Sequence, residues 1–191
     1  MLGILKLDKL RRERLPPQSR SVRPEATAAG LHPMVATKLW SNPCWLSFRA
    51  NYIAHHFNQP LYEWIARKYK LSAPEHVVLY AVGLEEGITA DDVVASSARP
   101  KNTLSRAVNA LVAKHLLTRV EDAADRRRKH LYLTRQGRRI VAETVPALVE
   151  HEQAMLASLS HNECRTLHDL MTKIVLSQNA WPTRIDEESK T

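Results

Sequence analysis

Residues 98–137 read ARPKNTLSRAVNALVAKHLLTRVEDAADRRRKHLYLTRQG, and this stretch decides the fold. Extended to residue 139, it holds twelve Lys or Arg against three acids, a net charge of +9, whereas the whole chain of 191 residues carries +8. The positive charge is therefore concentrated in one segment. A charge run is often only a solvated face, but concentration of this degree is typical of a surface that binds a polyanion.

The first half of the stretch predicts a helix. Pro100 suits the first turn, where the missing N–H of proline costs nothing. After it, apolar residues recur at helical spacing, from Leu104 to Val112. Short polar and cationic side chains fall mostly off that apolar stripe, and such groups hydrogen-bond base edges and phosphates in a major groove. The DNA-binding residues predicted on this helix are Lys101, Asn102, Thr103, Ser105, Arg106 and Asn109.

The second half predicts a β-hairpin. Two short apolar strands, 116–120 and 130–134, flank a segment that is first acidic and then strongly basic. A helix followed by a hairpin with a basic tip is typical of a winged helix-turn-helix, so the predicted fold is mainly α with one small hairpin. A basic hairpin is also found in RNA-contacting proteins, but here the cations lie on two elements that a winged helix directs at one duplex. The tip residues predicted to contact DNA are Arg126, Arg127, Arg128 and Lys129.

Several short motifs in this stretch fall at a characteristic spacing. They are Asn102-Thr103-Leu104-Ser105-Arg106, the pair Leu116-Leu117 before Arg119, Glu121-Asp122-x-x-Asp125-Arg126-Arg127, and Leu131-x-Leu133-Thr134-x-x-Gly137. Through these motifs the chain resembles the MarR family of bacterial transcription regulators, over roughly residues 42 to 180. His115 stands where that family usually has Gly, and a left-handed His is tolerated there.

The resemblance implies roles that the residue pattern alone does not. In the family, the terminal helices form a homodimer, an Asp equivalent to Asp125 braces the hairpin, and an Arg equivalent to Arg127 enters the minor groove. Members commonly bind small anionic aromatic effectors, for which the candidates here are Trp45, Arg49, Tyr52, His56 and His76. One branch senses organic hydroperoxides through a Cys near the start of its first long helix, where this chain has Cys44. Each of these residues also has a plain alternative as a core residue, a dimer contact or an inert thiol.

The rest of the chain is predicted to surround this reading lobe with helices. Residues 1–41 form a basic extension or arm, 42–180 the winged-helix domain and 181–191 a polar tail. Within the domain, 72–137 is the DNA-reading lobe, and 42–70 and 138–180 are dimerisation helices. Asn42 is expected to cap the first of these helices, which Pro60 should kink or divide. Ser72 with Glu75 and Ser160 with Glu163 predict capping boxes, and Thr89 with Asp92 predicts a helix start.

Composition and local motifs argue against other classes of protein. There is no run of eighteen apolar residues and no visible secretory signal, so the chain is expected in the cytoplasm and off the membrane. Two cysteines make no disulfide framework, and neither a metal site nor a cofactor loop is visible. His55-His56 with Glu63, or His151-Glu152, could be drawn as acid–base pairs, but adjacent His residues point to different helix faces, so an enzyme is not expected.

The sequence therefore predicts a transcription regulator that binds double-stranded DNA. Its fullest form is a homodimeric, ligand-responsive repressor on a palindromic operator. Two alternatives stay open. One is a winged-helix protein that binds DNA without sensing an effector, such as an architectural or replication accessory factor. The other is a thiol-based redox regulator.

Overall fold

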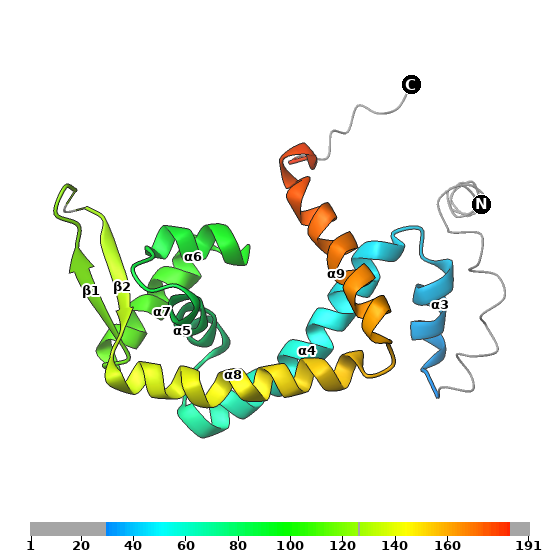
Figure 1. Ribbon diagram of the computed structural model, residues 1–191, viewed down its shortest axis with the longest axis horizontal. Coiled ribbons are helices and arrows are strands. Elements are labelled where there is room, and N and C mark those ends of the chain that lie inside the picture. Colours follow the sequence, from blue (N-terminus) through cyan, green and yellow to red (C-terminus); the bar gives the residue numbers. More distant parts are fainter. Residues whose placement is uncertain (1–29, 126, 184–191) are drawn as a thin grey trace. The chain divides into compact units, whose positions relative to one another are not determined.

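The computed structural model of the chain describes residues 30–125 and 127–183 (Figure 1). It divides into two compact units, the first ending at Val141 and the second beginning at Ala142. The fold is mainly helical with one two-stranded antiparallel sheet, as the sequence predicts. The elements are α3 (Pro33–Ser41), α4 (Trp45–Tyr69), α5 (Ala73–Leu84), α6 (Ala90–Ser97), α7 (Lys101–Ala113), β1 (Leu117–Glu121), β2 (Lys129–Leu133), α8 (Arg135–Leu156), α9 (His161–Leu176) and the short 3-10 helix η2 (Gln178–Ala180).

Three helices begin with the capping signals that the sequence carries. In each of them the carboxylate at the third helical position accepts a hydrogen bond from the backbone N–H of the capping residue. This bond and its reciprocal partner satisfy N–H groups that the first turn would otherwise leave unpaired. The pairs are Ser72–Glu75 for α5, Thr89–Asp92 for α6 and Ser160–Glu163 for α9.

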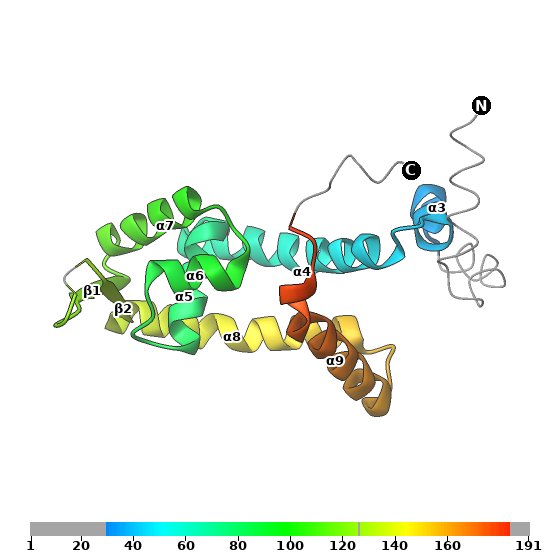
Figure 2. The same ribbon diagram turned by 90° about the horizontal axis from the view of Figure 1, so that it is seen from above.

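The core of the first unit lies where α5 packs on α7 and the root of the hairpin. From α7, Leu104, Val108 and Leu111 are almost fully buried, so the predicted apolar stripe is the face that packs inward. Val78 on α5 and Leu131 on β2 meet it in the same core. Because one face of α7 is buried in this way, its opposite, polar face is exposed to solvent. The helix lies beside the hairpin (Figure 2).

Hydrogen bonds to neighbouring segments hold most of the hairpin in place. β1 and β2 pair from Leu117 opposite Leu133 to Glu121 opposite Lys129, one residue away from the predicted bounds. On its other side β2 bonds to the segment before α6, where Leu131 N–H donates to the Ile88 carbonyl at 2.9 Å. The Gly87 N–H returns a bond to the Leu131 carbonyl at 2.8 Å. The root of the hairpin is therefore held from both sides, and only the loop beyond residue 121 extends past this support.

The helix ends depart from prediction in several places. Asn42 does not cap α4: its side-chain oxygen accepts the N–H of Cys44 at 2.9 Å, and Cys44 is the N-cap. Helix α3 was not predicted, and it lies inside the segment expected to be an arm. Pro60 does not divide α4, since Leu61 and Ile65 are buried just after it and hold the helix to the core despite the missing backbone bond.

Further boundaries shift by a few residues. Gly83 lies within α5, one residue before its end, and Pro100 is the N-cap of α7 rather than a residue of its first turn. α8 begins at Arg135, before Gly137, and ends at Leu156 with Pro146 inside it. His115 has the expected left-handed conformation, with φ of 56°. None of the helices in the described ranges has both the length and the apolarity to cross a membrane.

Candidate nucleic-acid interface

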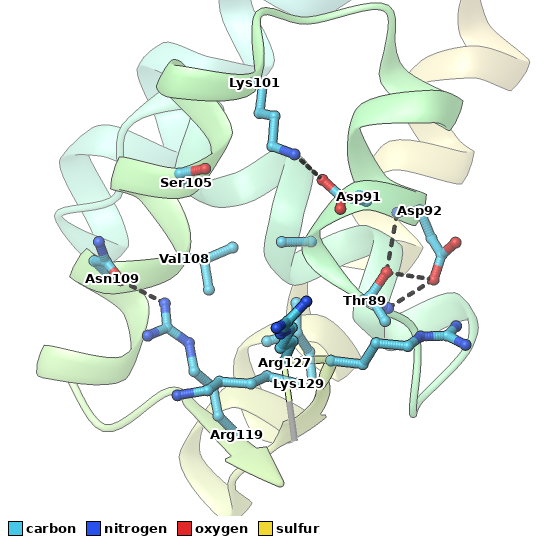
Figure 3. Close-up of a pocket in the computed structure, with 13 residues that line it drawn as sticks. Thr89, Asp91, Asp92, Lys101, Ser105, Val108, Asn109, Arg119, Arg127 and Lys129 are labelled. Carbon is cyan, nitrogen blue, oxygen red and sulfur yellow. Dashed lines mark hydrogen bonds and ion pairs between the residues drawn. The ribbon is translucent and has the colours of Figure 1, made fainter. Parts of the chain in front are cut away.

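A groove of about 530 Å³ lies between the start of α6, the polar face of α7 and the hairpin (Figure 3). Five of its side chains are Lys or Arg and two are Asp, so it carries excess positive charge; we call it the cationic groove. It joins the two surfaces that the sequence predicts to bind DNA, the helix and the hairpin tip. Its lining residues are Thr89, Ala90, Asp91, Asp92, Lys101, Ser105, Val108, Asn109, Arg119, Arg127, Arg128, Lys129 and Leu131.

The predicted contacts on α7 divide between this groove and open solvent. Lys101, Ser105 and Asn109 recur every fourth residue and line the groove as one row. Asn102 and Arg106 are exposed on the adjoining row, and Thr103 is half-buried. Lys101 is the least free of the set, because its Nζ lies 2.7 Å from Asp91 Oδ1 at the start of α6.

The loop of the hairpin is shaped by two carboxylates. Asp125 Oδ1 accepts the backbone N–H of Arg127 at 3.0 Å, two residues further along the loop. Asp122 Oδ1 accepts the N–H groups of Ala124 at 2.7 Å and of Asp125 at 3.0 Å. We call the strands β1 and β2 with this loop the wing. Arg127, Arg128 and Lys129 are exposed on it, and Arg126 lies outside the described residues.

His130 connects the wing to the rest of the unit. Its Nε2 lies 2.8 Å from Asp122 Oδ2, and its Nδ1 lies 2.5 Å from the Gly87 carbonyl oxygen. Both partners can only accept, so an imidazole that bonds to both must carry a proton on each nitrogen. The hydrogen bond with Asp122 accordingly raises the pKa of His130, and the same bond lowers the pKa of Asp122 to about 2. The sequence pattern predicted no role for His130 or for its pairing with Asp122.

This pairing makes the wing sensitive to pH. A raised folded-state pKa means that the stabilisation is fully present below the unfolded pKa of about 6.5 and is lost as pH rises through the folded value. Asp122 stays ionised throughout that window. Asp92 also stays ionised, because the hydrogen bond from the Thr89 backbone N–H lowers its pKa. The cation that faces His130 is Arg128. We therefore expect DNA affinity at constant ionic strength to fall as pH rises above neutrality.

The matched variant for this pH prediction is His130→Gln, which cannot titrate. This variant should bind DNA more weakly than the wild type at low pH, and its affinity should change less across about pH 6 to 8.5. Affinity measured for both proteins by fluorescence anisotropy checks the prediction. An identical pH profile for the two proteins would show that another group is responsible.

Not all of the local positive charge serves the groove. Lys114 Nζ bonds to Glu75 Oε1 at 2.6 Å and to the Lys70 carbonyl at 2.9 Å, so this cation ties α7 to α5. Arg99 donates to the Tyr62 hydroxyl at 3.2 Å, and Arg138 pairs with Glu86 at 2.8 Å. The charge count of +9 thus overstates the cations available to a ligand. Arg119, by contrast, was not among the predicted DNA-binding residues, yet it lines the groove with its Nη2 2.5 Å from Asn109 Oδ1.

The effector candidates do not gather in one place within the first unit. Trp45, Arg49, Tyr52 and His56 follow one another along α4, where the Tyr52 and His56 rings stack at 4.0 Å. Arg49 donates to the Leu39 carbonyl at 2.6 Å and to the Trp45 carbonyl at 3.1 Å.

His76 lies instead on α5, between the Tyr62 and Tyr80 rings. Burial lowers the pKa of His76 to about 4, so the ring is neutral. Cys44, the candidate redox residue, is exposed.

Comparisons with known proteins point to the same elements. Residues 69–128, from the end of α4 to the wing, match the model of the MarR family. The transcriptional regulator HosA of Escherichia coli O157:H7 is 27% identical over 119 residues, 62% of this chain and 88% of HosA.

Two solved structures are similar in fold and in sequence. MepR of Staphylococcus aureus in complex with DNA is 26% identical, with a TM-score of 0.60, over 70% of this chain and 97% of MepR. BpsR of Bordetella bronchiseptica, whose DNA binding is regulated by 6-hydroxynicotinic acid, is 27% identical, with a TM-score of 0.54, over 66% of this chain and 98% of BpsR.

Proposed function

Because the chain belongs to the MarR family of winged helix-turn-helix transcription regulators, we propose that it recognises a palindromic operator as a homodimer and acts there as a ligand-responsive repressor. The observation that carries the proposal is the cationic groove between α7 and the wing. In this arrangement α7 enters the major groove of the DNA and Arg127 reaches its minor groove. The phosphate backbone between these two DNA grooves runs over the cations of the cationic groove. Because the proposed partner is the chromosome, the proposed location is the cytoplasm.

A second copy of the chain is the proposed partner of α9. Within the described residues no side chain of this helix is buried, although apolar residues that share one face of a helix normally pack against a neighbour. Six of them are between 39 and 78% exposed: Leu167, Leu170, Met171, Ile174, Val175 and Leu176. A two-fold pairing through this face would cover them and present two copies of α7 to half-sites about one helical turn apart, which is why the proposed operator is palindromic.

An effector is proposed on the strength of the family and of the polar-aromatic row on α4. The DNA binding of BpsR, a protein of similar structure, is regulated by 6-hydroxynicotinic acid, which is a small aromatic acid. In this chain Arg49 lies against the Trp45 ring, 5.8 Å from its centroid, which places a cation beside an aromatic face. A small anionic aromatic compound suits such a pair. Release of DNA by such a compound would support the proposal, and release by hydroperoxide that depends on Cys44 would favour the redox alternative.

The direct test begins by mapping binding sites across the genome of the source cell and then compares one operator with random DNA. Arg106 is exposed on α7 and Ser105 lines the cationic groove, so replacing either by Ala should leave the fold intact. We expect each change to weaken operator binding about tenfold and random-DNA binding much less, since a base contact carries sequence information and a phosphate contact does not. Arg67→Ala, which removes an exposed cation from α4, is the matched control.

Equal losses on operator and random DNA would make Ser105 and Arg106 phosphate contacts. A wild-type footprint that is indifferent to sequence would overturn the proposed function itself and leave an architectural DNA-binding protein.

A further inference from the structure

Arg119 fixes the orientation of one side chain on α7, the helix proposed to recognise the operator and called here the recognition helix. The guanidinium of Arg119 extends from β1 to Asn109 on α7, where Nη2 donates to Oδ1 at 2.5 Å (Figure 3). Arginine can only donate hydrogen bonds. The bond therefore requires the carbonyl oxygen of the Asn109 amide to face the strand, and the amide nitrogen to face away from it.

The strand geometry explains why Arg119 reaches the helix. Side chains alternate between the two faces of a strand, so Arg119 shares a face with Leu117, two residues before it. Leu117 is 1% exposed and packs into the core. Arg119, one step further along β1, is therefore directed towards α7 at the edge of that core, and it lines the cationic groove together with Asn109.

The orientation of the amide changes which base it suits. A free asparagine reads adenine with both ends of its amide, because the oxygen accepts from N6 while the nitrogen donates to N7. In Asn109 the oxygen is already bound by Arg119, and the exposed end offers two N–H donors. Guanine presents two acceptors, O6 and N7, in the major groove.

We propose that Arg119 is a positioning residue that converts Asn109 into a hydrogen-bond donor, so that α7 selects guanine over adenine at the base pair facing Asn109. This inference rests on the proposed function, since it concerns how an operator is read. It assigns Arg119 a role in specificity through Asn109 and not a base contact of its own. The same bond also ties the wing to the recognition helix. It would have this structural effect even if it had no influence on base specificity.

The experiment measures binding to operator variants that carry each of the four base pairs at each position. We expect the wild type to prefer guanine about tenfold at one position of each half-site, and Asn109→Ala to abolish that preference. Arg119→Met frees the amide oxygen and should shift the preference at that same position from guanine towards adenine. Arg119→Lys keeps a donor next to Oδ1 and should retain guanine. Thermal unfolding of each variant checks that the wing and helix remain folded.

Three results separate the inference from the proposed function. If Arg119→Met weakens binding equally to all operator variants and leaves the base preference unchanged, Arg119 is a structural brace only and the inference fails. If Asn109→Ala leaves the base preference unchanged at every operator position, Asn109 reads no base and the inference also fails. If the wild type itself shows no base preference at any position, the proposed function fails, and the inference fails with it.

Discussion

Gly137→Ala should destabilise the first unit by about 2–3 kcal/mol or more, the largest stability effect we expect from a single methyl group. A Cβ at this position would overlap the carbonyl oxygen of Leu116 and lie 3.1 Å from its carbonyl carbon. Neither atom belongs to a flexible side chain, so the backbone itself must move. The roughly 1 kcal/mol that Ala gains over Gly inside a helix is too small to offset this overlap.

Gly83→Ala is the matched control for this prediction, because Gly83 is also a helical glycine in a close contact. Its added Cβ would lie 2.7 Å from Val141 Cγ1, the end of a side chain that can rotate. The free energy of unfolding, measured by urea titration for both variants, should therefore fall much further for Gly137→Ala. Equal stability of the two variants would mean that the Leu116 backbone yields easily.

Arg127→Ala should weaken operator binding by up to about a hundredfold, the largest affinity effect we expect from a single residue on the wing. The Asp125 carboxylate holds the backbone N–H of Arg127, and the side chain lines the cationic groove. An arginine placed at the tip of a wing can enter a narrow minor groove, where the negative potential is enhanced. Arg135→Ala is the control: it also removes one positive charge, but from the first residue of α8 at the root of the wing.

A salt series on operators with A·T or G·C flanks separates the two roles of Arg127. Each lost phosphate contact should reduce the salt slope by about one unit. Loss of a minor-groove arginine should in addition remove a preference for A·T flanks, because A-tracts narrow that groove. If Arg127→Ala keeps the flank preference of the wild type, the wing only clamps phosphates and does not read the shape of the duplex.

The features that the sequence predicted are those set by neighbouring residues. The apolar stripe of α7 follows from a 3.6-residue period, and the capping boxes at Ser72 and Ser160 need only a spacing of three. The wing followed from a local alternation of apolar and charged segments. Its strand bounds were wrong by one residue, since pairing register is decided across the hairpin and not along it.

The features that the sequence did not predict depend on residues far apart in the chain. His130 meets the Gly87 carbonyl across 43 residues, and Lys114 meets Glu75 across 39. A count of charges assigns Lys114 to the DNA surface, because only the packing of α7 on α5 shows that its ammonium group is already engaged. Arg119 was missed for the same reason: its partner Asn109 lies on another element, and neither residue signals the pair.

The connection between the wing and α8 consists of Thr134 alone, since β2 ends at Leu133 and α8 begins at Arg135. Thr134 is fixed at both ends: its N–H donates to the Leu116 carbonyl at 3.1 Å, its hydroxyl donates to the His115 carbonyl at 2.8 Å, and the Gly137 N–H donates to its Oγ1 at 3.0 Å. So short and so tightly bonded a link holds the first turn of α8 and β2 in a fixed orientation to each other. β2 has five residues, about 17 Å of strand, so a rotation of about 10° at Thr134 moves the far end by about 3 Å, roughly the length of a hydrogen bond. Because the Leu131 bonds to Ile88 and Gly87 hold β2 to the segment before α6, a turn of α8 can displace the wing from its proposed DNA contacts only if that segment moves with it.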